Sequence, residues 1–544
     1  MQRIAASAWQ RGATPRLALT FGFGSALLAL YYLVLWPLSV SLSEGPWFTY
    51  EYLSGNAALW ERVLALYEWL PWLSPWAEPS RELLGGLWLM LCSALFAIYL
   101  AAFLVLRWTV RVAGPREQRL TLALALVFPV AMQLVLLLMP GIVTTDVFSY
   151  VMYGQIAATY GGNPFVQFPA LYPDNPALAW IAPIWHNAPS IYGPLWIDVS
   201  WAIDHLTSGW GIVGQVLAYR ALVNLAQLAN VGLFWLIVRR IEPRAALPLT
   251  MLFAWNPLLL FEFSANGHND ALMLTFVLLA VYCCTRRLLA MAIVALALSA
   301  MVKFVTLLVL PLFLAYWARR QPTPARQAAA FLGGGALAVL VIVVIYLPWY
   351  AGIGTFSALL SWTTNPLYTN SPTDMLANDL ARLMNPGGSG VFETLVWLRG
   401  VLKWIALTVL AAYLGWETLR VRALRDVLAA SARVLLVFLL VANPWVLPWY
   451  FSWPLTFGLL AGWGARTARV AFSFSLTVLA VLHFNALWGG ASPASTLNVI
   501  YLAPLLLPIL PRLFLPAAGG SIGPSVLVGV RPSGEQRTVK ARAA

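Results

Sequence analysis

Apolar runs of about 20 residues recur along most of the chain, and they restrict its possible folds more than any other feature. One of them, "LALALVFPVAMQLVLLLMP", ends directly before Gly141. A helix of this length crosses the hydrocarbon core of a bilayer and satisfies its own backbone hydrogen bonds there. Only 10% of the residues are charged, whereas soluble domains average about a quarter. We therefore predict an all-α, polytopic membrane protein.

Length and polarity together predict about 14 membrane spans. Their expected starts lie near residues 17, 83, 119, 213, 245, 271, 288, 304, 327, 398, 428, 449, 470 and 497. The basic N-terminus "MQRIAASAWQRGATPR" precedes an apolar run that is too long for a cleaved signal, so we interpret that run as the first span. Residues 1–516 are expected to form one transmembrane domain, followed by a disordered cytoplasmic tail over residues 517–544.

Basic residues gather in every second connection between the expected spans. The positive-inside rule assigns such connections to the cytoplasm. They contain Arg107, Arg111, Arg116, Arg119, Arg239, Arg240, Arg244, Arg286, Arg287, Arg319, Arg320, Arg326, Arg420, Arg422, Arg425, Arg466 and Arg469. Both termini are also basic, which agrees with an even number of spans. We expect a multi-pass protein of the cell membrane with both termini in the cytoplasm. The net charge of +13 is spread over helix ends, so no nucleic-acid partner is predicted.

The alternate connections are long, and they contain most of the acidic residues. Three of them, 43–82, 141–212 and 351–395, are expected outside the cell. No Lys or Arg lies between Arg119 and Arg220, and the turn sequences "YGGNPF", "YPDNP" and "IYGPLW" divide this region into short pieces. "IDVSWAIDHL" is too short and too polar to span a bilayer, so we expect an interfacial helix there. The active site is therefore expected at the outer face, with residues 141–212 as its catalytic loop.

Four places put ionisable groups at or near membrane depth, where the default interpretation is a function. Asp146 follows the third expected span in "GIVTTDVFSY". The sequence "SANGHND" holds His268, Asn269 and Asp270 between two spans. Arg220 and Lys303 lie in the outer halves of apolar segments. Two acids and two cations near one membrane face are what a group transfer from a lipid phosphate requires.

Structural interpretations stay open for each of these groups. Arg220 and Lys303 could snorkel to the interface, and Asp146 could cap a helix. Asn269 or Asp270 could begin the next helix. Other residues are given structural interpretations only. Arg399 and Lys403 are interpreted as anchors of the tenth span, and His186, His205 and His483 as interface residues. Cys92, Cys283 and Cys284 lie within spans and lack metal-ligand spacing.

Five blocks carry a resemblance to a known family. In chain order they are "TTDVFSYVMYGQIAATYGGNPF", "YGPLW", "NGHNDALML", "VKFVTLLVLPL" and "NPWVLPWYFSW". Over roughly residues 141–455 the chain resembles the membrane-embedded GT-C glycosyltransferases, most of all the polyprenol-phosphate-mannose-dependent alpha-1,6-mannopyranosyltransferases. The resemblance implies a GT-C-like fold in which the first two spans are an N-terminal addition. Asp146 is followed by Val147 rather than by a second acid, so no metal site and no required cofactor are predicted, and a role for a divalent metal stays open.

The resemblance implies a glycosyltransferase that moves a hexose, with mannose carried over from the family, from a polyprenyl-phosphate donor to a glycolipid or glycan acceptor. Asp146 would be the general base of an inverting displacement, and Arg220 and Lys303 would bind the donor phosphate. His268, Asn269 and Asp270 would orient the acceptor or the loop. Tyr150 and Tyr192 would share this orienting role, and the aromatic side chains that could stack on sugar rings are Tyr150, Trp196 and Trp445.

Two other classes of protein could place charges in a membrane. A transporter or flippase of lipid-linked sugars also uses intramembrane charges and broken helices. Such a protein is expected to hold its polar residues near the bilayer midplane within inverted repeats, whereas here they gather on one side. The second class is an assembly scaffold of the cell envelope, which would give no functional reason for an ionisable residue at Asp146. The glycosyltransferase is the function that we expect.

Overall fold

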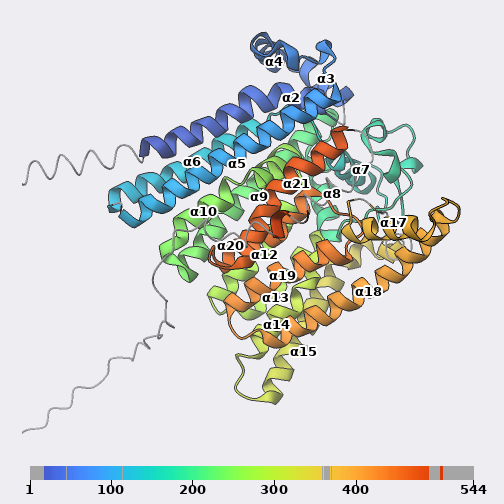
Figure 1. Cartoon of the computed structure of the whole chain (residues 1–544). Helices are drawn as coiled ribbons and strands as arrows, with labels where there is room; N and C mark the ends of the chain where they lie inside the picture. Colours follow the sequence, from blue (N-terminus) through green and yellow to red (C-terminus); the bar gives the residue numbers. More distant parts are fainter. Residues whose placement is uncertain are drawn as a thin grey trace, which may run out of the picture.

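The computed structural model describes residues 17–43, 46–112, 114–357, 359–360, 368, 370–488, 501 and 503–505. Helices make up the architecture (Figure 1), and the described part of the chain contains no strand. The all-α prediction is therefore confirmed. The start of the chain before residue 17, most of the span expected near residue 497 and the expected tail over residues 517–544 lie outside the described residues.

The number of long membrane helices is smaller than expected. Among the described residues, six helices are long and apolar enough to cross a bilayer. They are the helical segment Leu17–Leu42, Arg81–Arg107 within α5 (Arg81–Val112), α6 (Pro115–Leu137), α9 (Gly211–Ile241), Pro324–Trp349, which contains α15 (Pro324–Tyr346), and α18 (Val391–Arg420). A helix pair bent by 43°, Pro243–Ala254 with Pro257–Ala265, brings the number to seven. The expectation of about 14 spans is therefore not confirmed.

Several apolar runs that were expected to be single spans form short helices instead. They are α10 (Ala246–Ala254), α11 (Pro257–Leu259), the π-helical η8 (Leu260–Ala265), α12 (Asp270–Thr285), α13 (Leu289–Val302), the 3-10 segment η9 (Phe304–Leu308), α14 (Leu310–Ala318), α19 (Leu424–Val437), the π-helical η12 (Phe438–Ala442), the 3-10 segment η13 (Pro448–Phe451) and α20 (Ser452–Ala461). The last long described helix is α21 (Arg466–Trp488). Hydropathy alone does not distinguish a lipid-facing span from a short helix that is buried within the protein.

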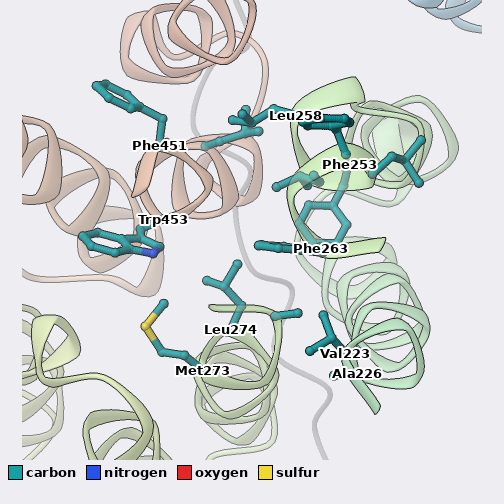
Figure 2. Packing of buried hydrophobic residues seen from close by; sticks show 14 of the residues in the cluster. Val223, Ala226, Phe253, Leu258, Phe263, Met273, Leu274, Phe451 and Trp453 are labelled. Carbon is teal, nitrogen blue, oxygen red and sulfur yellow. The ribbon is translucent and has the colours of Figure 1, made fainter. Parts of the chain in front are cut away.

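The core lies where these short helices meet α9. Figure 2 shows Phe253 of α10 and Phe263 of η8 pointing toward the same interior as Leu274 of α12 and Trp453 of α20. All four side chains are at most 3% exposed. This packing fixes the N-terminal end of α12, where the polar sequence "SANGHND" stands.

The expected catalytic loop, residues 141–212, folds into two helices joined by short turns. Its helices are α7 (Asp146–Ala158) and α8 (Pro194–Leu206), and the turns between them include the 3-10 segments η4 (Pro169–Leu171), η5 (Pro176–Trp180) and η6 (Pro183–Trp185). α7 and α8 pack closely, because a Cβ atom on Gly154 would lie 2.8 Å from the carbonyl oxygen of Ser200. The sequence expected to form an interfacial helix is the body of α8.

The connection between the first two long helices reaches the same end of the molecule as α7. It contains α3 (Pro46–Ser54) and α4 (Ala57–Trp69), which project beyond the ends of α2 (Trp36–Leu42) and α5 in Figure 1. Phe48 of α3 packs against Phe148 of α7 with ring centroids 5.2 Å apart, and against Trp180 at 6.0 Å. The N-terminal helices therefore help to hold the segment that begins with Asp146. On the opposite flank, α17 (Pro372–Met384) packs along α18.

Gly193→Ala is expected to destabilise the protein, because Gly193 has no room for a side chain. Its Cβ would lie 2.1 Å from the carbonyl oxygen of Met301, and its amide donates to the carbonyl of Val302 at 3.1 Å. Separating these backbones is expected to cost about 1–3 kcal/mol. The measurement is the apparent midpoint of thermal unfolding in detergent. Gly86→Ala in α5 is the control, since no atom lies within 4 Å of its Cβ position; an equal loss in both variants would contradict the prediction.

Candidate active site

A cavity of about 1150 Å³ opens between the start of α7, the segment before Tyr192, η9, α17, α18 and the segment that leads into η13. Small-molecule sites usually have volumes of about 300–1,000 Å³, so this cavity is slightly larger than a typical ligand site. The ionisable side chains that line it are Asp146, Tyr192, Lys303, Tyr368, Asp374, Arg399, Lys403, Tyr450, Tyr346 and His483. Acids and cations therefore face one space.

Asp146 is the first residue of α7, and its carboxylate lines the cavity with 25% of the side chain exposed. The segment before it is fixed by Gly141, whose amide donates to Ser39 Oγ at 3.1 Å. Asp146 is not the N-cap residue of α7; that position belongs to Thr145, which makes no side-chain cap bond. Burial raises the pKa of the Asp146 carboxyl above its ordinary value, while His268 and Lys303 act in the opposite direction.

His268 lies between two carboxylates. Its Nδ1 is 3.7 Å from Asp146 Oδ2, and its Nε2 is 3.2 Å from Glu262 Oε2. The imidazole is fully buried and stacks on Trp449 with ring centroids 3.6 Å apart. Gly267 precedes it with a φ of +77°, a conformation that favours glycine and lets the chain turn from η8 into α12. The turn between η8 and α12 therefore places the His268 imidazole beside Asp146, the carboxylate that the sequence led us to expect as catalytic.

Lys303 reaches the cavity from the junction of α13 and η9, and its charge is held by Asp270. Its Nζ lies 3.1 Å and 2.8 Å from the two carboxylate oxygens of Asp270. Asp270 is fully buried and also accepts a hydrogen bond from Trp453 Nε1 at 2.6 Å. The ammonium lies 4.7 Å from the ring centroid of Tyr450. Lys303 is 17% exposed, so it keeps access to the cavity while Asp270 does not.

Arg220 lies in the first half of α9, as expected, but not at the cavity. It is fully buried and is not among the side chains that line the cavity. Its guanidinium donates to the carbonyls of Met139 at 2.8 Å, Gly141 at 3.3 Å and Leu137 at 3.4 Å. These carbonyls are at and just beyond the C-terminal end of α6, where a positive charge is favourable. Arg220 therefore holds the backbone that leads to Asp146, and its geometry does not favour phosphate binding.

The other expected residues divide between the cavity and the core. Tyr192 and Trp445 line the cavity. Tyr150 and Trp196 are at most 1% exposed and pack on each other at 4.9 Å, so neither is free to stack on a sugar. Asn269 takes the N-cap position of α12, but its buried side-chain atoms make no hydrogen bond within the described residues.

Two cations that were interpreted as membrane anchors also line the cavity. Arg399 Nε of α18 lies 2.7 Å from Asp374 Oδ1 of α17, and Lys403 follows one turn later on α18. Leu402, Ala406 and Leu407 continue the cavity wall along the same helix with apolar side chains. One helix therefore lines the cavity with two cations, Arg399 and Lys403, and with an apolar surface that begins between them and continues beyond Lys403.

Two residues at the site, Glu262 and His483, were not among the site residues expected from the sequence. Glu262 is fully buried in η8, and His483 in α21 was interpreted as an interface residue. His483 Nε2 lies 2.8 Å from Glu262 Oε1, although 221 positions separate them. The one available signal was a carboxylate inside the apolar run "LLLFEFSAN". In the described residues, no group of three or more His, Cys, Asp and Glu side chains is arranged to hold a metal ion.

Comparison with known proteins connects this site to glycosyl transfer. Residues 54–319 match a family described as "Alpha-(1->6)-mannopyranosyltransferase, N-terminal domain", and residues 208–444 match "Glycosyltransferase family 87". Alpha-(1->6)-mannopyranosyltransferase A of Mycobacterium tuberculosis is 24% identical over 340 residues, which cover 59% of this chain and 62% of that protein. A probable alpha-(1->6)-mannopyranosyltransferase of Mycolicibacterium smegmatis is 25% identical over 384 residues, covering 63% and 66%.

A third relative is similar over a shorter stretch. Alpha-(1->6)-mannopyranosyltransferase B of Corynebacterium glutamicum is 31% identical over 144 residues, or 25% of this chain and 23% of that protein. The chain thus aligns with less than two thirds of the length of each of these three relatives. The two matched family regions together run from residue 54 to residue 444 and include Asp146, His268 and Lys303.

Proposed function

We propose that this chain is a GT-C mannosyltransferase that transfers a mannosyl group from a polyprenyl phosphate to a glycolipid or glycan acceptor at the outer face of the cell membrane. The single observation that carries the proposal is that two carboxylates, Asp146 and Asp374, and three cations, Lys303, Arg399 and Lys403, line one cavity of about 1150 Å³. The names of the relatives support mannose as the sugar.

The proposed outer location is supported by the length of α6, which separates Arg116 and Arg119 from the cavity. Arg116 and Arg119 lie in the first turns of α6, and Asp146 follows shortly after the helix ends at Leu137. A helix of this length spans about 30 Å, the thickness of the hydrocarbon core. α9 runs the other way, with Arg239 and Arg240 in its last turn. If those arginines are cytoplasmic, then Asp146 is at the outer face.

The reaction can be written as a single displacement. The acceptor hydroxyl gives its proton to the Asp146 carboxylate while its oxygen attacks the anomeric carbon of the donor. The bond from that carbon to the phosphate oxygen breaks, and the phosphate keeps the electron pair. A β-linked donor then yields an α-linked product. Asp146 supplies general-base catalysis, which typically contributes about 10²–10⁴-fold.

The cations stabilise the phosphate as it gains charge. Lys303, Arg399 and Lys403 line the cavity, whereas Arg220 is occupied by backbone carbonyls, so we assign the phosphate to the first three. Fixed positive charges act strongly where little water competes. The apolar wall of Leu402, Ala406 and Leu407 on α18 suits the isoprenoid chain next to the phosphate.

The test uses purified full-length protein in lipid nanodiscs. The donor is radiolabelled polyprenyl-phosphate mannose, and the acceptor is an alkyl glycoside of α-1,6-linked dimannose. Transfer of label to the acceptor with release of polyprenyl phosphate is expected. Mass spectrometry of envelope glycolipids from cells with and without the intact gene then identifies the natural acceptor. Movement of intact donor across the membrane without any transfer would instead support the flippase.

Arg399→Ala and Lys403→Ala are each expected to raise the KM for the donor about tenfold or more, since a hydrogen bond to a charged group is worth about 1.5–3 kcal/mol. The KM for the acceptor is expected to change little. Initial rates at varied donor mole fraction measure the effect. Arg425→Ala is the matched control, because Arg425 forms an exposed ion pair with Glu242 outside the cavity. Unchanged donor kinetics in both cavity variants would remove α18 from phosphate binding.

A further inference from the structure

Four ionisable side chains form an unbroken chain behind the proposed catalytic base. Their order in space is Asp146, His268, Glu262 and His483, with N···O distances of 3.7, 3.2 and 2.8 Å between successive members; the first is an electrostatic contact, since His268 Nδ1 makes no hydrogen bond within the described residues. Glu262 and His268 are fully buried, while Asp146 and His483 at the two ends line the cavity. The members come from α7, the turn before α12, η8 and α21, so the fold assembles the chain from distant sequence positions.

Two carboxylates lie on either side of the His268 ring and favour a positive charge on it. Each of its two ring nitrogens faces a carboxylate, Asp146 at Nδ1 and Glu262 at Nε2. Nδ1 is too far from Asp146 for a hydrogen bond, and Nε2 also lies 3.4 Å from Thr144 Oγ1, but an unprotonated ring nitrogen would turn its lone pair toward a carboxylate, which accepts and does not donate. Trp449 stacks on the ring at 3.6 Å, a contact that also favours a cation. Both contacts therefore favour the imidazolium form of His268.

Glu262 in turn is held as an ion by groups at both of its oxygens. Oε1 faces His483 Nε2 at 2.8 Å, and Oε2 accepts from Asn266 Nδ2 at 3.0 Å as well as facing His268. A buried carboxylate without such partners would be strongly unfavourable. With both imidazoles protonated, two negative and two positive charges alternate along the chain and cancel. A neutral set of this kind can be buried at much lower cost than a lone ion.

We propose that Glu262 and His483 are positioning residues that keep His268 doubly protonated, so that His268 holds Asp146 as the carboxylate that accepts the acceptor proton. This inference rests on the proposed function of Asp146 and adds to it. Neither Glu262 nor His483 touches the reacting atoms in this mechanism. Their effect passes through the charge on His268, because an adjacent cation favours the ionised form of a carboxylic acid.

Other charged or titratable groups also act on this chain. Asp146 is influenced by Lys303, which favours its ionised form, and by Asp270 and Glu262, which oppose it. The remaining titratable neighbours are Tyr150, Tyr192 and Tyr450 for Asp146, and Cys92 for Glu262. None of these tyrosines or the cysteine supplies a positive charge, so His268 and Lys303 are the cations that support the Asp146 carboxylate within the described residues.

Glu262→Gln removes the charge of Glu262 and keeps its shape. The acidic limb of the kcat/KM profile against pH is expected to move about one unit or more toward higher pH, because Asp146 loses the cation that favours its ionised form. Activity should recover at high pH, which a merely structural defect would not allow. His483→Gln keeps an N–H donor for Glu262 and is expected to move the limb in the same direction by less.

Glu417→Gln is the matched control. Glu417 is a buried carboxylate of α18, 2% exposed and 2.6 Å from Arg433, and it does not line the cavity. Glu417→Gln breaks a buried ion pair that lies away from the cavity. The acidic limb of its kcat/KM profile against pH should therefore not move. The proposal would be overturned if Glu262→Gln and His483→Gln kept the wild-type elution volume and unfolding midpoint and the acidic limb of their pH profiles did not move. If Glu262→Gln does not fold, His483→Gln decides.

A second measurement does not need activity. The chain has four histidines, so nitrogen NMR of histidine-labelled protein can be assigned by single substitutions. His268 is expected to be doubly protonated at pH 7 in the wild type and to lose one proton in Glu262→Gln. A neutral His268 in the wild type overturns this inference whether or not mannose is transferred. Absence of transfer with a doubly protonated His268 would instead count against the proposed function.

Discussion

Asp146→Asn is expected to lower kcat about 10²–10⁴-fold while leaving the KM for the donor nearly unchanged. Asparagine matches the shape of aspartate but cannot accept the acceptor proton, so the loss should equal the usual contribution of a general base. The carboxylate lines the cavity and lies at the N-terminal end of a helix whose position is fixed by Gly141, Arg220 and Phe48. Single-turnover rates with polyprenyl-phosphate mannose separate this chemical effect from donor binding.

The pH profile gives a second test of the same residue. Burial raises the pKa of Asp146, and the base works only when ionised, so kcat/KM should fall as the pH drops through that raised pKa. The acidic limb should disappear in Asp146→Asn. Asp198→Asn is the control, since this half-buried carboxylate binds Trp349 Nε1 at 2.9 Å and does not line the main cavity. Near-normal turnover in Asp146→Asn would exclude Asp146 as the base.

Asp270→Asn is expected to destabilise the protein by about 3 kcal/mol, because it leaves the Lys303 ammonium without its buried counter-charge. Both oxygens of Asp270 contact Lys303, and one also accepts from Trp453. The apparent midpoint of thermal unfolding should therefore fall strongly. The donor KM should also rise, since Lys303 loses the partner that fixes it beside the cavity.

A double variant distinguishes a lost ion pair from lost packing. Asp270→Leu with Lys303→Met removes both charges and is expected to be more stable than Asp270→Asn alone, since breaking a buried pair costs more than replacing it. The double variant should nevertheless transfer poorly, because a phosphate-binding cation is gone. Glu242→Gln, which breaks an exposed pair with Arg425, should change stability by no more than about 1 kcal/mol. Equal losses of stability in Asp270→Asn and the double variant would contradict this account.

The sequence predicted the residue types of the site better than their contacts. A charge near membrane depth is costly wherever it stands, so Asp146, Asp270 and Lys303 could be singled out without coordinates. Arg220 could be identified for the same reason, but the sequence does not show which side of α9 faces the cavity. In the structure its guanidinium binds the carbonyls at the end of α6, which no local pattern indicates.

Contacts between distant segments could not be predicted at all. Glu262 and His483 meet across 221 positions, and a lone histidine in an apolar helix has no spacing that reveals its partner. The number of spans was overestimated for a related reason. The runs of α10 to α14 are as apolar as true spans, yet Pro257 and the π-helical η8 divide them into short helices that bury one another. Hydropathy measures the preference to leave water and does not identify the neighbour that replaces it.

The cavity wall on α18 has a consequence for how rates should be measured. Two cations on this helix and an apolar face that continues beyond them suit a molecule that stays dissolved in one leaflet and slides in sideways. For such a substrate the collision frequency depends on its two-dimensional density. Diluting the nanodisc sample with buffer that holds the acceptor at the same concentration should then leave the turnover unchanged, whereas diluting the donor with inert phospholipid should lower it.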